Sequence, residues 1–182
     1  DVQPKYLNTP ETQLFHKSRL IYGLDKAKQD IKLKGQAVLV EGQMDVVMSH
    51  QSGVKNVVAC SGTALTPDHL EILKRYTPKI VFAFDQDTAG QEASKKSINL
   101  AIEKEMNAKM AILPKEFKDA GEVISKDAKI WQEAVEKPLS VIDWYFEKVF
   151  FKHLHDENWQ KSQIEPTAEQ KKEIARELLP II

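Results

Sequence analysis

The sequence predicts an α/β fold: a mostly parallel central sheet of about four strands flanked by helices, followed by a C-terminal helical segment. Two observations predict it. Short apolar runs alternate with amphipathic helical patterns through the middle of the chain, which is the order expected when crossover helices join parallel strands. After about residue 125 only helical patterns remain. With 182 residues, of which 42% are hydrophobic, the chain is long enough to bury a sizeable core.

The first 17 residues are polar and contain Pro4 and Pro10, so no regular structure is expected there. A helix is predicted from Ser18 to about Lys34, because apolar residues recur at steps of three and four. The sequence Thr66-Pro67-Asp68 is a helix start signal: a capping hydroxyl, Pro at the first helical position and an acid facing the macrodipole. The predicted strands span 37–40, 56–60, 79–84 and 109–113, and the helices that follow them span 44–50, the segment after Thr66, 90–106 and 121 onward.

The C-terminal part is predicted to be helical. Pro138 is placed to begin a helix whose apolar stripe runs to Phe150. A polar connection over 153–166 follows, and Thr167-Ala-Glu-Gln170 is a capping box that opens a final helix. The expected domains are therefore a lead-in segment and helix over 1–35, a central domain over 36–125, and the start of a helical subdomain over 126–182.

Composition limits the classes of function. The net charge of −1 neither requires nor excludes a polyanionic partner. The single cysteine, Cys60, forms no intrachain disulfide, so a reducing, cytoplasmic setting is expected. No run of about 18 apolar residues is present, so no membrane partner is expected. The chain starts at Asp1 without an initiating Met, and we expect it to be a piece of a longer protein.

Acidic residues follow several predicted strands. Glu41 comes after the first strand, Asp85 and Asp87 after the third, and Asp119 shortly after the fourth. The carboxyl ends of parallel strands meet at one edge of a sheet, where ligands bind, so these side chains are expected to converge. Two like charges about 4 Å apart repel by roughly 4 kcal/mol at an effective dielectric constant of about 20. Hard divalent cations neutralise such oxygen clusters, so the sequence predicts a magnesium-type site and phosphate chemistry.

Simpler interpretations stay open. Asp85 and Asp87 lie on one side of an extended segment, yet Asp85 can simply end the strand while Asp87 caps the next helix. Asp45, in the first turn of a predicted helix, is by itself typical of a helix start. A rival is the Asp-x-Asp motif of haloacid-dehalogenase-like phosphotransferases, which usually place Thr or Val two residues after the second Asp, where this chain has Ala89.

The segment Glu41-Gly42-Gln43-Met44-Asp45 and the segment Phe84-Asp85-Gln86-Asp87-Thr88-Ala89-Gly90 lie at the ends of the first and third predicted strands. They are preceded by the lead-in Pro4-Lys5-Tyr6-Leu7-Asn8-Thr9-Pro10-Glu11-Thr12, with Leu14 to Arg19 and Tyr22-Gly23-Leu24. With these segments, the chain resembles over most of its length the catalytic core of bacterial DnaG-type DNA primases. The first two are similar to the two signatures of the TOPRIM fold, which topoisomerases and some nucleases share. The lead-in is similar to the primase segment before TOPRIM and selects primase.

The resemblance implies a role for each matching residue. Glu41 is expected to be a general acid or base or to contact metal, with Asp85 and Asp87 binding Mg²⁺ or Mn²⁺ and Asp45 supporting the site. Asp119 matches the first acid of the Asp-Pro-Asp of primases, but Gly121 replaces the second, which leaves the number of metal ions open. Contacts to nucleic-acid or nucleotide phosphates are expected from a further set, for which a solvated face is the alternative: Lys5, Tyr6, Asn8, Lys17 and Arg19.

The function that the resemblance implies is metal-dependent synthesis of RNA primers from ribonucleoside triphosphates on a single-stranded DNA template. The replicative helicase is expected to contact a region that is not in this chain. Because the chain lacks a Cys/His zinc-ligand set, we expect this piece alone to be weakly active or inactive. Two alternatives remain: a TOPRIM nucleic-acid-binding module that lost full metal competence through Gly121, and a TOPRIM nuclease or topoisomerase.

Overall fold

The computed structural model describes residues 10–13, 15–60, 64–84, 88–154 and 166–179, and for residues 88–93 it describes the backbone only. The chain divides into two compact units, Asp1–Pro138 and Leu139–Ile182. The domain boundaries expected near residues 35 and 125 stay predictions.

The first unit contains four of the described strands and most of the described helices. Its elements in chain order are η1 (Lys17–Arg19), α1 (Leu24–Lys34), β1 (Ala37–Val40), α2 (Gln43–Gln51), β2 (Val57–Ala59), α3 (Pro67–Lys74), β3 (Lys79–Phe82), α4 (Thr88–Glu103), β4 (Asn107–Met110), α5 (Ala120–Lys126) and α6 (Ala128–Glu136). The described residues of the second unit form a two-residue strand and two helices: β5 (Leu139–Ser140), α7 (Val141–Leu154) and α8 (Ala168–Leu178).

The four strands of the first unit lie in the order β2-β1-β3-β4, and their pairings are all parallel. Val38 of β1 pairs with Val57 of β2 on one side and with Val81 of β3 on the other. Every residue of β1 and β2 is buried, as expected for strands covered on both faces. The predicted fold class, a mostly parallel sheet flanked by helices, is confirmed.

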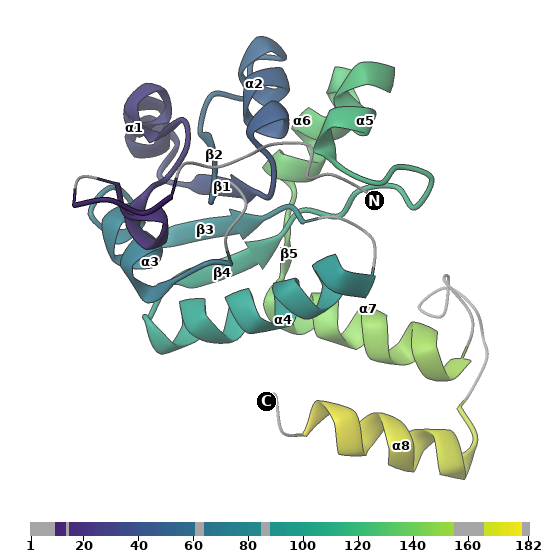
Figure 1. Ribbon diagram of the computed structural model, residues 1–182. Coiled ribbons are helices and arrows are strands. Elements are labelled where there is room, and N and C mark those ends of the chain that lie inside the picture. The colour runs from purple at the N-terminus through teal and green to yellow at the C-terminus, as the bar shows by residue number, and fades with distance from the viewer. Residues whose placement is uncertain (1–9, 14, 61–63, 85–87, 155–165, 180–182) are drawn as a thin grey trace, which may run out of the picture. The chain divides into compact units, whose positions relative to one another are not determined.

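Helices cover both faces of this sheet (Figure 1). α2, α5 and α6 lie on one face, where Val38, Val40 and Val81 pack in one cluster with Val123 of α5 and the fully buried Trp131 of α6. α4 lies on the opposite face (Figure 1) and buries Ile98 and Ala101. The carboxyl ends of the strands are therefore flanked by the beginnings of α2 and α4 and by α5.

The predicted helix over 18–34 is wrong in its first six residues. Residues 17–19 form a 3-10 turn, and α1 begins only at Leu24. Between them Tyr22 forms an antiparallel bridge with Ala59, and Gly23 has a φ of 79°. A left-handed residue cannot continue a helix, and glycine reaches this conformation without strain. The apolar periodicity through Leu20 and Ile21 therefore did not indicate helix.

Two other elements differ from their predicted positions. The fourth strand starts two residues earlier than predicted, because Asn107 pairs with Lys79 and the pairing ends at Met110. The helix predicted from Gly121 onward is two helices, since Asp127 ends α5 and caps α6 by accepting a hydrogen bond of 2.8 Å from the amide of Lys129. The remaining strands and helices of the first unit lie within about three residues of their predicted ends.

The second unit is a helical hairpin. α7 begins at Val141 rather than at Pro138, after the short strand β5. Trp144, Tyr145 and Val149 of α7 and Ile174 and Leu178 of α8 are buried. The predicted capping box of α8 is confirmed: the hydroxyl of Thr167 accepts from the amide of Gln170, and the Gln170 side chain accepts from the amide of Thr167.

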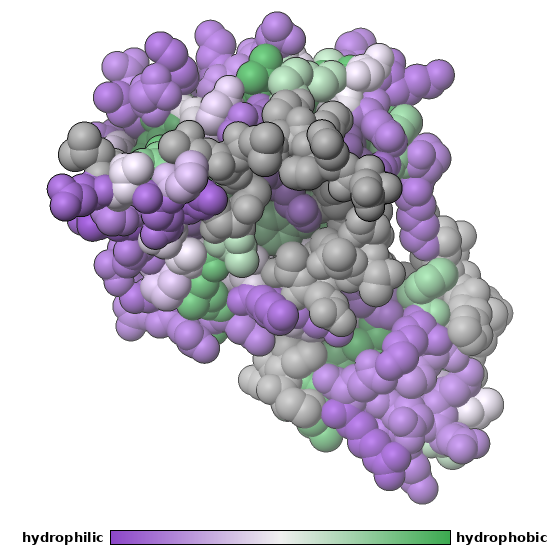
Figure 2. Space-filling model, in the orientation of Figure 1, coloured by the Kyte–Doolittle hydropathy of each residue, from purple (hydrophilic) through white to green (hydrophobic). Residues whose placement is uncertain are grey.

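The coloured part of the surface in Figure 2 is mainly hydrophilic, with small hydrophobic patches. Single exposed apolar side chains also occur, such as that of Leu33, which is 85% exposed, and they are ordinary on a protein surface. Within the described ranges, none of the helices combines the length and the apolar character that a bilayer crossing requires.

Candidate active site

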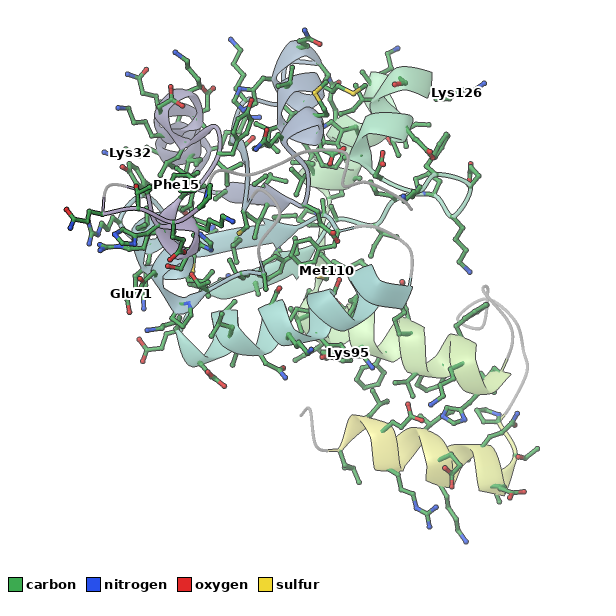
Figure 3. All side chains as sticks on the ribbon, in the orientation of Figure 1. Phe15, Lys32, Glu71, Lys95, Met110 and Lys126 are labelled. Atoms are coloured by element: carbon green, nitrogen blue, oxygen red, sulfur yellow. The ribbon has the colours of Figure 1, made fainter. Side chains whose placement is uncertain are left out.

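Three of the predicted acidic residues lie at the carboxyl edge of the sheet. Glu41 directly follows β1 and is exposed, and Asp45 lies in the first turn of α2. Asp119 caps the N-terminus of α5, which follows β4, the strand that ends at Met110 (Figure 3). Asp85 and Asp87 lie outside the described residues, so their predicted metal contacts stay predictions.

The carboxylate of Asp45 joins two of the loops at this edge. One of its oxygens, Oδ2, accepts a hydrogen bond of 3.2 Å from the amide of Gly42, the residue after Glu41. The other, Oδ1, accepts a hydrogen bond of 2.9 Å from the amide of Gly121 in α5. Asp45 therefore fixes the turn that carries Glu41 against the helix that Asp119 begins.

Gly121 lies in a crowded place between two carboxylates. A Cβ at this position would lie 3.1 Å from Oδ1 of Asp45, 3.3 Å from Oδ1 of Asp119 and 3.3 Å from the sulfur of Met48. Each of these distances is shorter than ordinary contact, so any side chain would have to displace its neighbours. The glycine thus allows α5 to approach α2 closely, a steric role that the comparison with Asp-Pro-Asp did not reveal.

Asp119 and Glu122 use their carboxylates to order the start of α5. Oδ1 of Asp119 accepts from the amide of Glu122 at 2.8 Å, which is an N-cap. Oε2 of Glu122 accepts from the amide of Lys118, also at 2.8 Å. That oxygen of Glu122 is bound to the loop before the helix. The structure therefore does not place Glu122 where it could replace the second acid of Asp-Pro-Asp, whose position Gly121 occupies.

The chemistry of these donors fits a hard divalent cation. Glu41 and the partly exposed Asp119 offer carboxylate oxygens at one edge, and oxygen ligands are those that Mg²⁺ and Mn²⁺ take. Within residues 10–13, 15–60, 64–84, 88–154 and 166–179, no three His, Cys, Asp or Glu side chains are grouped closely enough to hold a metal ion. A site with three such ligands would draw on residues outside those ranges, where the predicted Asp85 and Asp87 lie.

The basic residues predicted to contact phosphates come from the lead-in segment. Lys5, Tyr6 and Asn8 lie outside the described residues. Lys17 and Arg19 belong to η1, where Lys17 is half-buried and Arg19 is exposed. η1 contacts the N-terminal turn of α3, so these two cations are held on the first unit.

His69 was not among the predicted site residues, yet it holds this lead-in segment. Its ring is completely buried, and its Nε2 lies 3.0 Å from the carbonyl oxygen of Lys17. Burial lowers the pKa of His69, against the smaller raising effects of the Lys17 and Leu20 backbone and of Asp68. A histidine at the place where a capping box normally has Glu or Gln was the one signal in the sequence.

Comparison with protein families matches two parts of the chain. Residues 38–124 match the family described as Toprim-like, and residues 1–28 match the N-terminal domain of the DNA primase catalytic core. Comparison with individual protein sequences also finds DNA primases. That of Clostridium acetobutylicum is 40% identical over 151 residues, which are 82% of this chain and 25% of that protein. That of Helicobacter pylori is 35% identical over 163 residues, which are 87% of this chain and 28% of that protein.

The chain belongs to the bacterial DnaG-type DNA primases. It spans about a quarter of the length of the curated primases that it matches. A requirement for metal ions is general in primases of the Toprim type.

Solved primase structures have the same fold. The zinc-binding and RNA polymerase domains of the Aquifex aeolicus primase match with a TM-score of 0.75 at 28% identity, over 100% of this chain and 45% of that one. A DnaG primase catalytic domain bound to single-stranded DNA also matches with a TM-score of 0.75, at 29% identity, over 100% of this chain and 56% of that one.

Proposed function

We propose that this chain is the Toprim part of an enzyme that synthesises RNA primers from ribonucleoside triphosphates on single-stranded DNA. Membership of the primase family supports the reaction, and the gathering of acids at the carboxyl edge of the sheet supports the location of the site. The observation that carries the proposal is the carboxylate of Asp45, which accepts hydrogen bonds from both Gly42 and Gly121. It joins the Glu41 turn and the Asp119 helix into one acidic edge.

Each residue of this edge has a proposed task. Glu41, exposed directly after β1, is placed to accept or donate a proton or to contact a cation. Asp119, with Asp85 and Asp87, would hold Mg²⁺ or Mn²⁺, and Asp45 would keep the two loops in register. When bound, such ions neutralise the charge of triphosphate and assist in-line phosphoryl transfer.

The proposed nucleic-acid contacts come from the lead-in segment. Lys17 and Arg19 would bind phosphates of the template or of the incoming nucleotide, and contacts of the same kind are proposed for Lys5, Tyr6 and Asn8. A related DnaG catalytic domain is bound to single-stranded DNA, which supports this class of partner. Phosphate contacts of this kind weaken steeply as salt concentration rises.

The intact protein would carry functions that this piece does not. We propose that it acts in the cytoplasm and meets the replicative helicase through a region outside this chain. Because the zinc-ligand set is not in this chain, we expect primer synthesis by the chain alone to be weak or absent.

The decisive experiment is calorimetric titration of the chain with Mn²⁺ and Mg²⁺. Binding is expected in the millimolar range or tighter, and it should be lost or much weakened in Asp85→Asn, Asp87→Asn and Glu41→Gln. Asp25→Asn is the matched control, since Asp25 is exposed on α1 and forms an ion pair with the neighbouring Lys26. Binding that all four variants retain would contradict the site.

The alternatives predict other results. A non-catalytic module would bind single-stranded DNA without binding metal. A nuclease or topoisomerase would cleave or relax supercoiled plasmid in Mg²⁺, and neither activity is expected of this chain. The comparisons favour neither alternative, because the relatives described above are primases.

A further inference from the structure

A completely buried histidine connects α3 to a segment 52 residues earlier in the chain. Nδ1 of His69 lies 3.3 Å from the amide nitrogen of Thr66, and Nε2 lies 3.0 Å from the carbonyl oxygen of Lys17. Both ring nitrogens therefore have a backbone partner, although the side chain has no contact with solvent.

Only one form of the ring satisfies both partners. The amide of Thr66 can only donate, so Nδ1 must accept. Nε2 must then carry the proton and donate it to the carbonyl of Lys17. A protonated ring would set an N–H against the N–H of Thr66, and burial already disfavours that form. His69 thus acts as a neutral bridge with an acceptor at one end and a donor at the other.

Thr66 holds the next carbonyl of the same segment. Its hydroxyl donates to the carbonyl oxygen of Ser18 at 2.6 Å and accepts from the amide of His69 at 3.2 Å. Two successive carbonyls, those of Lys17 and Ser18, are therefore bound by two side chains from the first turn of α3.

Among the described residues, no side chain of η1 is buried, and Leu20 after it is 44% exposed. The nearest buried apolar side chain is that of Ile21, which follows η1 by two residues. Arg19 and Asp68 form an ion pair of 3.8 Å, but their side chains are 63% and 51% exposed, and exposed pairs contribute little. The hydrogen bonds from His69 and Thr66 thus join the backbone of η1 directly to α3.

We propose that His69 is a positioning residue, which holds η1 on α3 and thereby sets where Lys17 and Arg19 present their charges to nucleic acid. The inference rests on the proposed function for its second half, the nucleic-acid partner. The first half, the fixing of η1, stands on the hydrogen bonds alone. His69 itself would touch neither substrate nor metal.

Two substitutions test the two hydrogen bonds of His69 one at a time. His69→Asn puts an amide oxygen near the position of Nδ1, so the new side chain can keep the capping bond from Thr66 but cannot reach Lys17. His69→Gln puts an amide N–H near the position of Nε2, so the new side chain can keep the bond to the Lys17 carbonyl. Both are neutral and smaller than His, so loss of packing affects both.

Hydrogen exchange measures the first half of the proposal without any ligand. In His69→Asn the amides of residues 16–20 are expected to exchange about fivefold faster than in the unaltered chain, the factor for one lost hydrogen bond. The exchange in α6 is the internal reference, and His69→Gln should show a smaller effect. Unchanged exchange at residues 16–20, or an equal rise in α6, would overturn the proposal.

Binding of a single-stranded oligonucleotide at several salt concentrations measures the second half. For single strands the slope of log K against log salt falls by about 0.7 for each phosphate that the protein no longer neutralises. His69→Asn should reduce the slope, and adding it to the pair Lys17→Gln and Arg19→Gln should change the slope little further. A purely structural defect would instead add to the loss from that pair of substitutions, and that result would overturn the proposal, as would a slope that His69→Asn leaves unchanged.

Failure of the proposed function gives a different pattern. If the unaltered chain bound no oligonucleotide at any salt concentration, the nucleic-acid role of Lys17 and Arg19 would be lost and the second half of the proposal with it. The hydrogen-exchange result would still decide whether His69 fixes η1.

Discussion

Oδ1 of Asp45 accepts a hydrogen bond of 2.9 Å from the amide of Gly121, which lies 76 residues further along the chain. The bond joins α2 to α5 across the carboxyl edge of the sheet. A residue expected to support a metal site is therefore also a structural connection between the two loops that carry Glu41 and Asp119.

Asp45→Asn is expected to lower the free energy of unfolding by about 1–2 kcal/mol. The Asn side chain has one oxygen for two backbone amides, so one buried N–H loses its acceptor. Urea denaturation measures the change, with Asp25→Asn as the exposed control. Unchanged stability together with lost Mn²⁺ binding would show that Asp45 acts as a ligand rather than as a connection.

Gly121→Asp is expected to be destabilised in the presence of EDTA and to recover in Mn²⁺. The new carboxylate would join those of Asp45 and Asp119 in a crowded place, and repulsion between such charges is on the order of 1–4 kcal/mol. Gly121→Asn has nearly the same shape without the charge, so it measures the steric part. Thermal unfolding is measured with and without Mn²⁺, and Mn²⁺ should raise the Tm of Gly121→Asp more than the Tm of Gly121→Asn. An equal rise in the Tm of both variants would contradict a shared cation position.

The stability of the chain is expected to fall below pH 6.5 partly through His69. Its pKa in the folded chain is lower than the ordinary value of 6.5 because the ring is buried, so the unfolded chain binds the proton more tightly. The contribution of the neutral His69 to the free energy of unfolding is complete above pH 6.5 and is lost as the pH falls towards the lowered pKa. Between pH 7.5 and pH 5.5, the free energy of unfolding measured by urea denaturation should fall less for His69→Gln than for the unaltered chain. An equal fall in both would mean that His69 has the same pKa in the folded chain as in the unfolded chain.

Cys60 is expected to resist alkylation in the folded chain. Cys60 as a whole residue is 7% exposed, and burial raises the pKa of its thiol to about 12 from an ordinary value of 9.0. Only the thiolate reacts, and a rise of that size in the pKa reduces the thiolate population by about 1000-fold. Mass spectrometry after iodoacetamide treatment at pH 8 should show slow labelling without urea and rapid labelling in urea. Rapid labelling of the folded chain would show that Cys60 is accessible.

The fold was predictable where a strand is apolar throughout. All four residues of β1 are hydrophobic and buried, and such a run bounded by turn signals has one simple interpretation. β4 begins with Asn107 and includes Lys109, so its position depends on pairing with β3 rather than on its own composition. The break before α1 likewise depends on the bridge between Tyr22 and Ala59, which links residues far apart in sequence.

The candidate site was predictable only in part for the same reason. Because ligands bind at the carboxyl ends of parallel strands, the sequence predicted that Glu41 and Asp119 belong to the site. The bond from Gly121 to Asp45 and the bond from His69 to Lys17 each join distant segments, and no spacing in the sequence reveals them. A buried histidine and a glycine with no free space around it are recognised only when their neighbours are known.

The bridge between Tyr22 and Ala59 also pairs part of the edge strand of the sheet. β2 is the strand at one end of the order, and its Ala59 donates to and accepts from the backbone of Tyr22 at 3.2 and 2.8 Å. Edge strands with unpaired backbone groups can pair with strands from other molecules. A version of this protein trimmed to start at α1 would leave the backbone N–H and C=O groups of Ala59 without Tyr22, and self-association would then compete with folding.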